Sequence, residues 1–167
     1  MRTCTNGFTL IELMVTLSIL ATLITIGMPS FSELLRNNAI TAAGNDLYAS
    51  LQFARSEAVS REVVVRVQAS GAQWSDGWNV FYKDDKGDDQ ILDVYRSMNK
   101  RIEISPKGNR LDAANSVRFT PTGRAVLAYD ESQDYFEVRL PTVRTRCVFM
   151  SATGRPFVKK SGEGDCP

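Results

Sequence analysis

The sequence of 167 residues contains no histidine. Histidine is the commonest general base and metal ligand in proteins, so its absence argues against hydrolytic and metal-dependent chemistry. The chain also has no Gly-x-Ser-x-Gly segment, and a nucleophilic serine would lack its usual base. We therefore expect a protein that is not an enzyme and that has no metal site and no cofactor.

An excess of charge of one sign is lacking as well. The chain has 20 Lys and Arg against 19 Asp and Glu, which gives a net charge of +1. A global charge of this size indicates no class of partner, so only local clusters of charge can carry such information.

Cysteine is scarce, with three residues in the chain. Cys4 lies in the short N-terminal leader described below, which leaves Cys147 and Cys166 in the remainder. This pair suits a disulfide in an oxidising compartment, where the closed loop would stabilise the fold by about 3 kcal/mol in the chain-entropy account. The alternative is a pair of reduced thiols.

One long hydrophobic run is present, from Phe8 to Met28, and Glu12 is its only charged residue. As a helix it would be about 31 Å long, which matches the hydrocarbon thickness of a bilayer. Residues 1–7 are too short and too polar for the core of an ordinary secretory signal, and no A-x-A-like cleavage site follows the run. A plain membrane anchor is the alternative, but it leaves Glu12 unexplained, because a carboxylate in lipid needs a partner or a function.

The segment from Gly7 to Glu12, GFTLIE, resembles the cleavage site of type IV pilin precursors. The resemblance implies that prepilin peptidase cuts between Gly7 and Phe8, that Phe8 is methylated, and that Glu12 is the fifth residue of the mature chain. Cleavage would create an amine on Phe8, four residues before Glu12. We hypothesise that Glu12 pairs with the Phe8 amine of a neighbouring subunit, because an ion pair relieves the cost of a buried carboxylate.

A helical apolar pattern continues beyond Pro29. It predicts one long helix from about Phe8 to Ser60, with its first half in lipid and its second half on a soluble domain. The residues that would form the core-facing stripe of the second half are Ile40, Ala43, Leu47, Leu51, Ala54 and Ala58.

From Glu62 the apolar pattern has a period of two, which is typical of strands. We therefore predict an α+β fold in which the long N-terminal helix packs on an antiparallel β-sheet domain, as in pilins. Turn signals such as Pro106–Asn109 separate many of the runs. The expected strands are Val63–Gln68, Trp78–Tyr82, Ile91–Arg96, Ile102–Ile104, Val117–Thr120, Ala125–Tyr129, Tyr135–Leu140, Cys147–Ser151 and Pro156–Lys159.

The chain thus divides into four predicted regions. They are a leader peptide (1–7), a transmembrane and assembly helix (8–29), the amphipathic soluble half of the helix (30–61) and a periplasmic β-sheet domain (62–167). The positive charge of Arg2 in the leader fits a cytoplasmic N-terminus.

Three further segments resemble the FimT/FimU/GspH family of minor pilins and pseudopilins. They are Phe53–Val59 (FARSEAV), Phe119–Arg124 (FTPTGR) and Ser151–Arg155 (SATGR). The resemblance implies a sparse subunit that helps to initiate assembly of type IV pili, and hence supports pilus biogenesis and twitching motility. It would be a single-pass inner-membrane protein before it enters the filament.

The partners that the resemblance implies are the major pilin, other minor pilins, prepilin peptidase and the inner-membrane assembly platform. Two alternatives remain open at this point. One is a GspH-like pseudopilin of type II protein secretion, and the other is a DNA-binding pilus subunit for natural transformation.

A basic cluster near the C-terminus bears on the DNA alternative, because residues 138–162 contain no acid. A stripe of cations could hold phosphates weakly, with strong dependence on salt. Some FimT relatives are implied to use Gly-Arg-x-Arg, whereas here Gly154-Arg155-Pro156-Phe157 lacks the second arginine. We favour an ordinary solvated edge whose lysines discourage strand pairing. The candidate DNA-binding residues are Arg144, Arg146, Arg155, Lys159 and Lys160.

Two other clusters have structural explanations. Five aspartates, at 84, 85, 88, 89 and 93, do not follow the spacing of a calcium loop, so we expect a solvated hairpin loop. Trp74 and Trp78 flank a Ser-Asp-Gly turn, and we expect both to cap the sheet core.

Overall fold

The computed structural model describes residues 8–96, 101–107, 116–126, 135–143, 145–151 and 153–160. It consists of two compact units, one up to Arg36 and one from Asn37 onward, and each is considered by itself below. A single helix, α1, contributes residues to both units.

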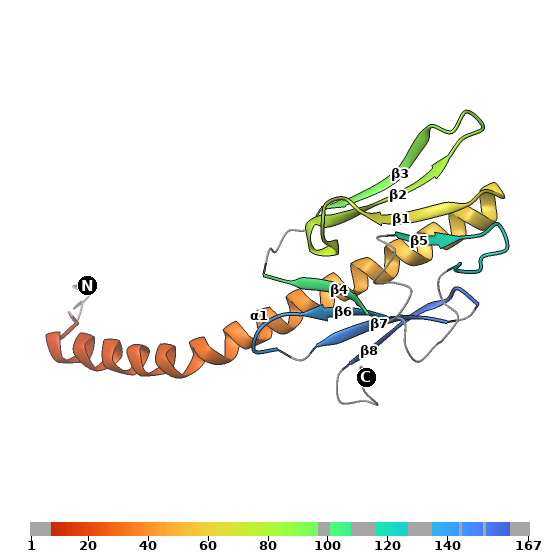
Figure 1. The fold of residues 1–167 in the computed structure, drawn as a ribbon. Helices are drawn as coiled ribbons and strands as arrows, with labels where there is room; N and C mark the ends of the chain where they lie inside the picture. Colours follow the sequence, from red (N-terminus) through yellow and green to blue (C-terminus); the bar gives the residue numbers. More distant parts are fainter. Residues whose placement is uncertain are drawn as a thin grey trace, which may run out of the picture. The chain divides into compact units, whose positions relative to one another are not determined.

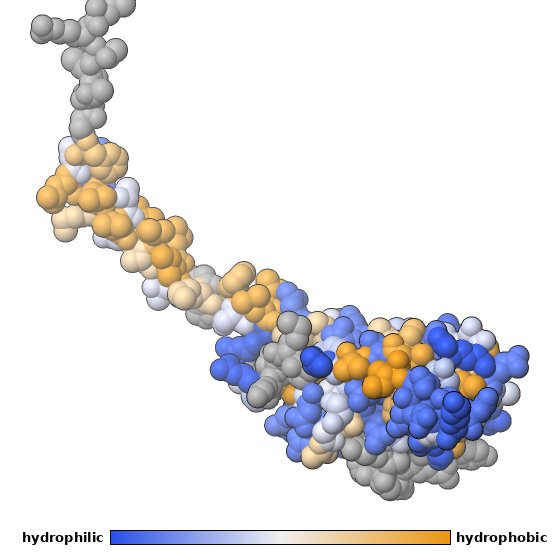
Figure 2. All heavy atoms as spheres, turned by 90° about the horizontal axis from the view of Figure 1, so that it is seen from above, coloured by the Kyte–Doolittle hydropathy of each residue, from blue (hydrophilic) through white to orange (hydrophobic). Residues whose placement is uncertain are grey.

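Helix α1 extends from Leu10 to Arg61, in agreement with the predicted long helix. It continues through Pro29, so the proline does not end it. In the first unit its large apolar side chains are exposed, and the N-terminal part of the helix is mostly hydrophobic in Figure 2. In the second unit the predicted stripe from Ile40 to Ala58 is buried at all six positions.

The residues described in the second unit form eight strands, shown in Figure 1. They make two antiparallel sheets of four strands each, which we call sheet A, in the order β3-β2-β1-β5, and sheet B, in the order β4-β6-β7-β8. The strands are β1 (Val65–Ala69), β2 (Gly77–Lys83), β3 (Asp89–Arg96), β4 (Glu103–Lys107), β5 (Ser116–Phe119), β6 (Tyr135–Arg139), β7 (Arg146–Met150) and β8 (Pro156–Lys160).

One hydrophobic core joins the second half of α1 to both sheets. A short 3₁₀-helix, η1 (Trp74–Asp76), connects β1 to β2 and buries Trp74 against Phe136 of sheet B, with ring centroids 4.7 Å apart. Next to it, the Ile104 N–H of β4 donates a hydrogen bond to Ser75 Oγ at 2.8 Å. Both tryptophans, Trp74 and Trp78, are buried, as expected. Through the Trp74 and Ser75 contacts, η1 connects sheet A to sheet B.

Two strand predictions require correction. The Pro106–Asn109 turn signal was wrong for Pro106 and Lys107, because both lie in β4. Strand β4 is an edge strand of sheet B, where a residue without an N–H group is tolerated. The strand expected at Ala125–Tyr129 appears as an isolated bridge between Ala125 and Phe119, and residues 127–129 lie outside the described part of the chain.

Candidate functional site

The first site is the start of α1, where Thr9 and Glu12 form a capping box. The carboxylate oxygen Oε2 of Glu12 accepts hydrogen bonds from the Thr9 N–H at 2.9 Å and from Thr9 Oγ1 at 2.8 Å. In return the Glu12 N–H donates to Thr9 Oγ1 at 3.3 Å. Sequence reasoning missed this role, although Thr-x-x-Glu before an apolar run is its usual signal. Glu12 therefore has a local function in addition to the predicted one.

Phe8 precedes the capping box and is 72% exposed, whereas Gly7 lies outside the described residues. The cleavage, the methylation and the intersubunit role of Glu12 thus remain predictions. In the described structure Oε1 of Glu12 makes no hydrogen bond, so half of the carboxylate is open to a further donor.

The apolar helix surface that follows contains hydroxyl groups with local partners. Side chains of Thr16, Ser18, Thr22 and Thr25 donate to backbone carbonyls three or four residues earlier, at 2.8–2.9 Å. Because these bonds satisfy the hydroxyl donors within the helix, the surface is less polar than its composition implies. Within the described residues, no helical stretch reaches both the length and the apolarity that a membrane span requires.

A second site joins the three segments that carry the family resemblance in the soluble unit. The turns Thr120–Arg124 and Ser151–Arg155, here called the paired turns, have the same hydrogen bonds. In each, the glycine N–H donates to the carbonyl of the first residue at 2.8 Å, and the first residue's N–H donates to the arginine carbonyl at 2.9 Å. Gly123 and Gly154 also share a left-handed conformation, with φ of 75° and 78°. This is a type I turn followed by a left-handed residue, a common hairpin connection.

The paired turns are in direct contact. A Cβ atom on Gly154 would overlap the carbonyl oxygen of Gly123 and lie 2.7 Å from the backbone nitrogen of Ala125. Arg55 of α1 adds a third element, because its Nε donates to the same Gly123 carbonyl at 2.9 Å. The two sheets therefore meet through backbone atoms of the paired turns, and the Arg55 side chain joins α1 to the same contact. The sequence signal that could have revealed it is the repeated triplet Thr-Gly-Arg.

The predicted basic residues do not form one surface. Arg146 faces α1, where its Cδ lies 3.8 Å from the position of a Cβ on Gly44. Lys159 lies on the opposite face of sheet B, with Nζ 5.3 Å and 5.7 Å from the ring centroids of Phe149 and Phe157. Arg155 is exposed in its turn, whereas Arg144 and the side chain of Lys160 are outside the described structure.

The burial of β7 explains this separation. Val148 and Met150 belong to the main core, and Cys147 and Phe149 form a second cluster with Tyr135 on the other face. Both faces of β7 are thus buried from Cys147 to Met150. Cys147 is buried and disulfide-bonded, but its expected partner Cys166 lies outside the described residues, so the pairing stays a prediction.

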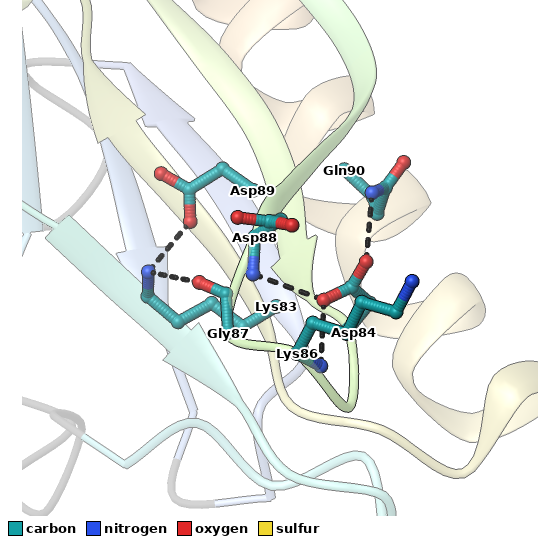
Figure 3. Close-up of polar contacts among 7 residues, drawn as sticks. All are labelled: Lys83, Asp84, Lys86, Gly87, Asp88, Asp89 and Gln90. Atoms are coloured by element: carbon teal, nitrogen blue, oxygen red, sulfur yellow. Dashed lines mark hydrogen bonds and ion pairs between the residues drawn. The ribbon is translucent and has the colours of Figure 1, made fainter.

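The aspartate-rich segment forms the β2–β3 hairpin turn, as predicted, and Figure 3 shows its polar contacts. Asp84 Oδ1 accepts hydrogen bonds from the N–H groups of Lys86 and Asp88, each at 2.9 Å. The backbone bond from Asp88 is the main reason why the pKa of Asp84 is below its usual value. Lys83 forms an ion pair with Asp89 at 2.9 Å. Among the described residues, no group of acids or cysteines is arranged to hold a metal ion.

A further polar pair lies between α1 and sheet A. The Tyr95 hydroxyl donates to Asp46 Oδ2 at 3.2 Å, and the Tyr95 ring stacks on Trp78 with centroids 4.0 Å apart. Burial raises the pKa of Tyr95 to about 12, and the charge of Asp46 acts in the same direction.

Comparison with known proteins places this geometry in a class. Two solved structures, both described as the type IV minor pilin FimU of Pseudomonas aeruginosa strain PAO1, resemble the chain at 23% sequence identity. The first has a TM-score of 0.58, and the match covers 73% of this chain and 97% of the FimU chain. The second has a TM-score of 0.62, and the match covers 80% of this chain and 96% of the FimU chain. A search of curated proteins gives no significant match. The predicted α+β fold, a long helix on an antiparallel β domain, is thus confirmed as pilin-like.

The sequence families make the assignment more specific. The N-terminal region, residues 2–28, matches the family described as the prokaryotic N-terminal methylation motif. Residues 43–154, more than half of the chain, match the family described as type II transport protein GspH. The chain belongs to this GspH family of minor pilins and pseudopilins, a family of structural subunits.

Proposed function

We propose that the chain is a filament subunit that is made as a precursor and trimmed between Gly7 and Phe8. Residues 8–29 would lie in the inner membrane before assembly and in the helical bundle of the filament afterward. The β-sheet domain from residue 62 onward would lie in the periplasm and select the partners. Those partners are the major pilin, other minor pilins and the assembly platform.

One observation carries this proposal: the exposed apolar segment of α1 begins at a capping box, close to Phe8, that contains Glu12, the only acid among residues 8–28. A run of exposed large apolar side chains needs cover from lipid or from other helices. Oε2 of Glu12 is occupied by Thr9, and the carboxylate still has its charge and a free Oε1. A methylated amine on Phe8 of an adjacent subunit supplies the matching cation.

Substitution at Glu12 tests the proposal. Glutamine also serves in capping boxes, so Glu12→Gln keeps the helix start and removes only the charge. We expect incorporation into filaments to fall about tenfold or more, because an ion pair in a low-dielectric bundle is lost. The measurement is quantitative immunoblotting of sheared filaments against the membrane pool.

Thr9→Val is the matched control, because it removes the two hydrogen bonds of Thr9 Oγ1, one to Glu12 Oε2 and one from the Glu12 N–H. The hydrogen bond from the Thr9 N–H and the charge of Glu12 remain. It should assemble far better than Glu12→Gln. Equal incorporation of Glu12→Gln and the unaltered chain would refute the charge pairing. Mass spectrometry of the mature protein should also find methylated Phe8 as its first residue.

Two filament systems remain candidates, each with its own support. The likeness to FimU favours a minor pilin of type IV pili, and the family name favours a pseudopilin of type II secretion. Deletion of the gene separates them, since loss of piliation and twitching supports the first and loss of protein secretion supports the second. For DNA uptake no specific observation adds support, because Arg146 and Lys159 lie on opposite faces.

A further inference from the structure

The outer face of sheet A, the face turned away from α1, carries an unusual row of side chains. Residues that are directly opposite on neighbouring strands point to the same face of a sheet. The register pairs Phe81 with Ile91, Arg66 with Phe81, and Arg66 with Arg118. Val126 extends the row, because its N–H donates to the Arg118 carbonyl at 2.9 Å beside the Phe119–Ala125 bridge. The row therefore reads Ile91, Phe81, Arg66, Arg118 and Val126.

Two arginines thus lie side by side without a carboxylate. Like charges that are directly opposite on adjacent strands destabilise a sheet. Within the described residues neither Arg66 nor Arg118 makes an ion pair. Of the two acids on these four strands, Asp89 is paired with Lys83, and Asp93 is in register with Val80, a core position. In the described parts of the chain the two guanidinium groups are therefore not neutralised by an ion pair.

Apolar side chains border the arginines on both sides. Ile91 is 62% exposed and Val126 is 43% exposed, and Val94 lies on the same face with 44%. Phe81 is buried although it is outside the main core cluster. Figure 2 shows a hydrophobic area bordered by hydrophilic residues on the part of the β domain that it presents.

We propose that the outer face of sheet A binds the acidic surface of a neighbouring filament subunit, an inference that rests on the proposed function. One or two carboxylates of that subunit bind between Arg66 and Arg118, and its apolar residues cover Ile91 and Val126. Guanidinium groups suit this role, because they bind carboxylates through two parallel hydrogen bonds and are enriched at the centres of protein interfaces.

The same observations favour a protein over a nucleic acid. A strand of nucleic acid needs cations spaced along its phosphates, and aromatic or polar contacts to its bases. Here only two cations occur in the row, its aromatic ring, Phe81, is buried and cannot stack on a base, and the exposed ends of the row are the aliphatic Ile91 and Val126. An apolar border around a charged centre is the composition of a protein interface.

Site-specific crosslinking in cells tests the inference with the full chain. A photoreactive phenylalanine analogue is placed at Ile91 or at Val126, and separately at Leu13 of α1 as a report on assembly. We expect Ile91 and Val126 to crosslink to a pilin-type subunit, at a peptide that contains Asp or Glu within a few residues. Crosslinks at Leu13 with none at Ile91 or Val126 would overturn the inference alone. Absence of crosslinks at all three positions would overturn the proposed function and the inference together.

Charge variants identify the contribution of the arginines. R66Q/R118Q should reduce the Ile91 and Val126 crosslinks about fivefold or more, because the carboxylates lose their partners. The same variant should unfold at an equal or higher temperature, because it removes like-charge repulsion. R139Q, on an exposed position of sheet B, is the matched control and should change neither measurement. Crosslinks that persist in R66Q/R118Q, or that map to a peptide without acids or to nucleic acid, would overturn the inference.

Discussion

Gly154 and Gly87 have nearly the same backbone conformation and opposite surroundings. Their φ angles are 78° and 86°, both in the left-handed region. A Cβ on Gly154 would overlap the Gly123 carbonyl, whereas a Cβ on Gly87 would meet nothing within 4 Å. The two positions therefore separate the strain of a left-handed backbone from the effect of the contact between the paired turns.

We expect Gly154→Ala to lower the free energy of unfolding by about 3 kcal/mol or more, because backbone atoms must move apart as well as accept the strain. Gly87→Ala should lower it by about 1 kcal/mol, the strain alone. Denaturant titration of both variants in detergent measures the difference. Similar losses for the two would show that the paired turns do not depend on their close contact.

At the residue scale the sequence revealed part of the site at the start of α1. Glu12 could be singled out because a lone acid in an apolar run is conspicuous. Its bonds to Thr9 were not predicted, although the Thr-x-x-Glu spacing is typical of a capping box. The contact of Gly154 with Gly123 had one sequence signal, the repeated Thr-Gly-Arg triplet, which indicates two similar turns but does not state that turns of two different sheets touch.

Gly44 lowers the intrinsic helix propensity of α1. It is buried in the second half of the helix, where glycine is less favourable than alanine. A Cβ there would lie 3.8 Å and 3.9 Å from two Arg146 carbons, which are ordinary van der Waals distances.

We therefore expect Gly44→Ala to raise the free energy of unfolding by about 0.5–1 kcal/mol, because the unfolded chain loses freedom and no atom must move. Ala49→Gly, at an exposed position of the same helix, is the reverse control and should lower it by a similar amount. Thermal or denaturant unfolding of both variants gives the two signs. Destabilisation by Gly44→Ala would mean that Arg146 packs more tightly on the helix than these distances indicate.

Periodicity predicted the elements better than it predicted their surroundings. The buried stripe from Ile40 to Ala58 followed from helical spacing, and most strands followed from alternation. The division into two sheets could not be read in the same way, because β5 leaves the neighbourhood of β4 to pair with β1. Strand β7 was predicted, but the burial of both its faces was not. When both faces are buried, the sequence shows no alternation of apolar and polar residues.

On the scale of the whole molecule, the burial of the Tyr95 hydroxyl, together with the charge of Asp46 beside it, makes stability depend on pH. The pKa of Tyr95 is about 12 in the folded protein and close to 10 in an unfolded chain. The folded state thus holds the proton more tightly. This contribution to stability is complete below about pH 10 and is lost as the pH rises to about 12.

The expected result is a decrease in the unfolding free energy between pH 10 and 12 that is steeper for the unaltered chain than for Tyr95→Phe. Phenylalanine keeps the ring that stacks on Trp78 and cannot ionise, so the comparison removes the effects of other groups. The measurement is denaturant unfolding across this range. Parallel pH profiles would show that the hydroxyl is not coupled to folding.

The contact between the paired turns has a consequence for how the family diverges. The close approach of the two turns is made by backbone atoms, the Gly123 carbonyl oxygen, the Ala125 nitrogen and the Arg124 carbonyl carbon, and Arg55 is the side chain that bonds to it. Outward-facing residues nearby can vary while these backbone atoms keep the spacing of the two sheets. For distant homologues, the paired Thr-Gly-Arg triplets should therefore be a more durable landmark than any stretch of surface sequence.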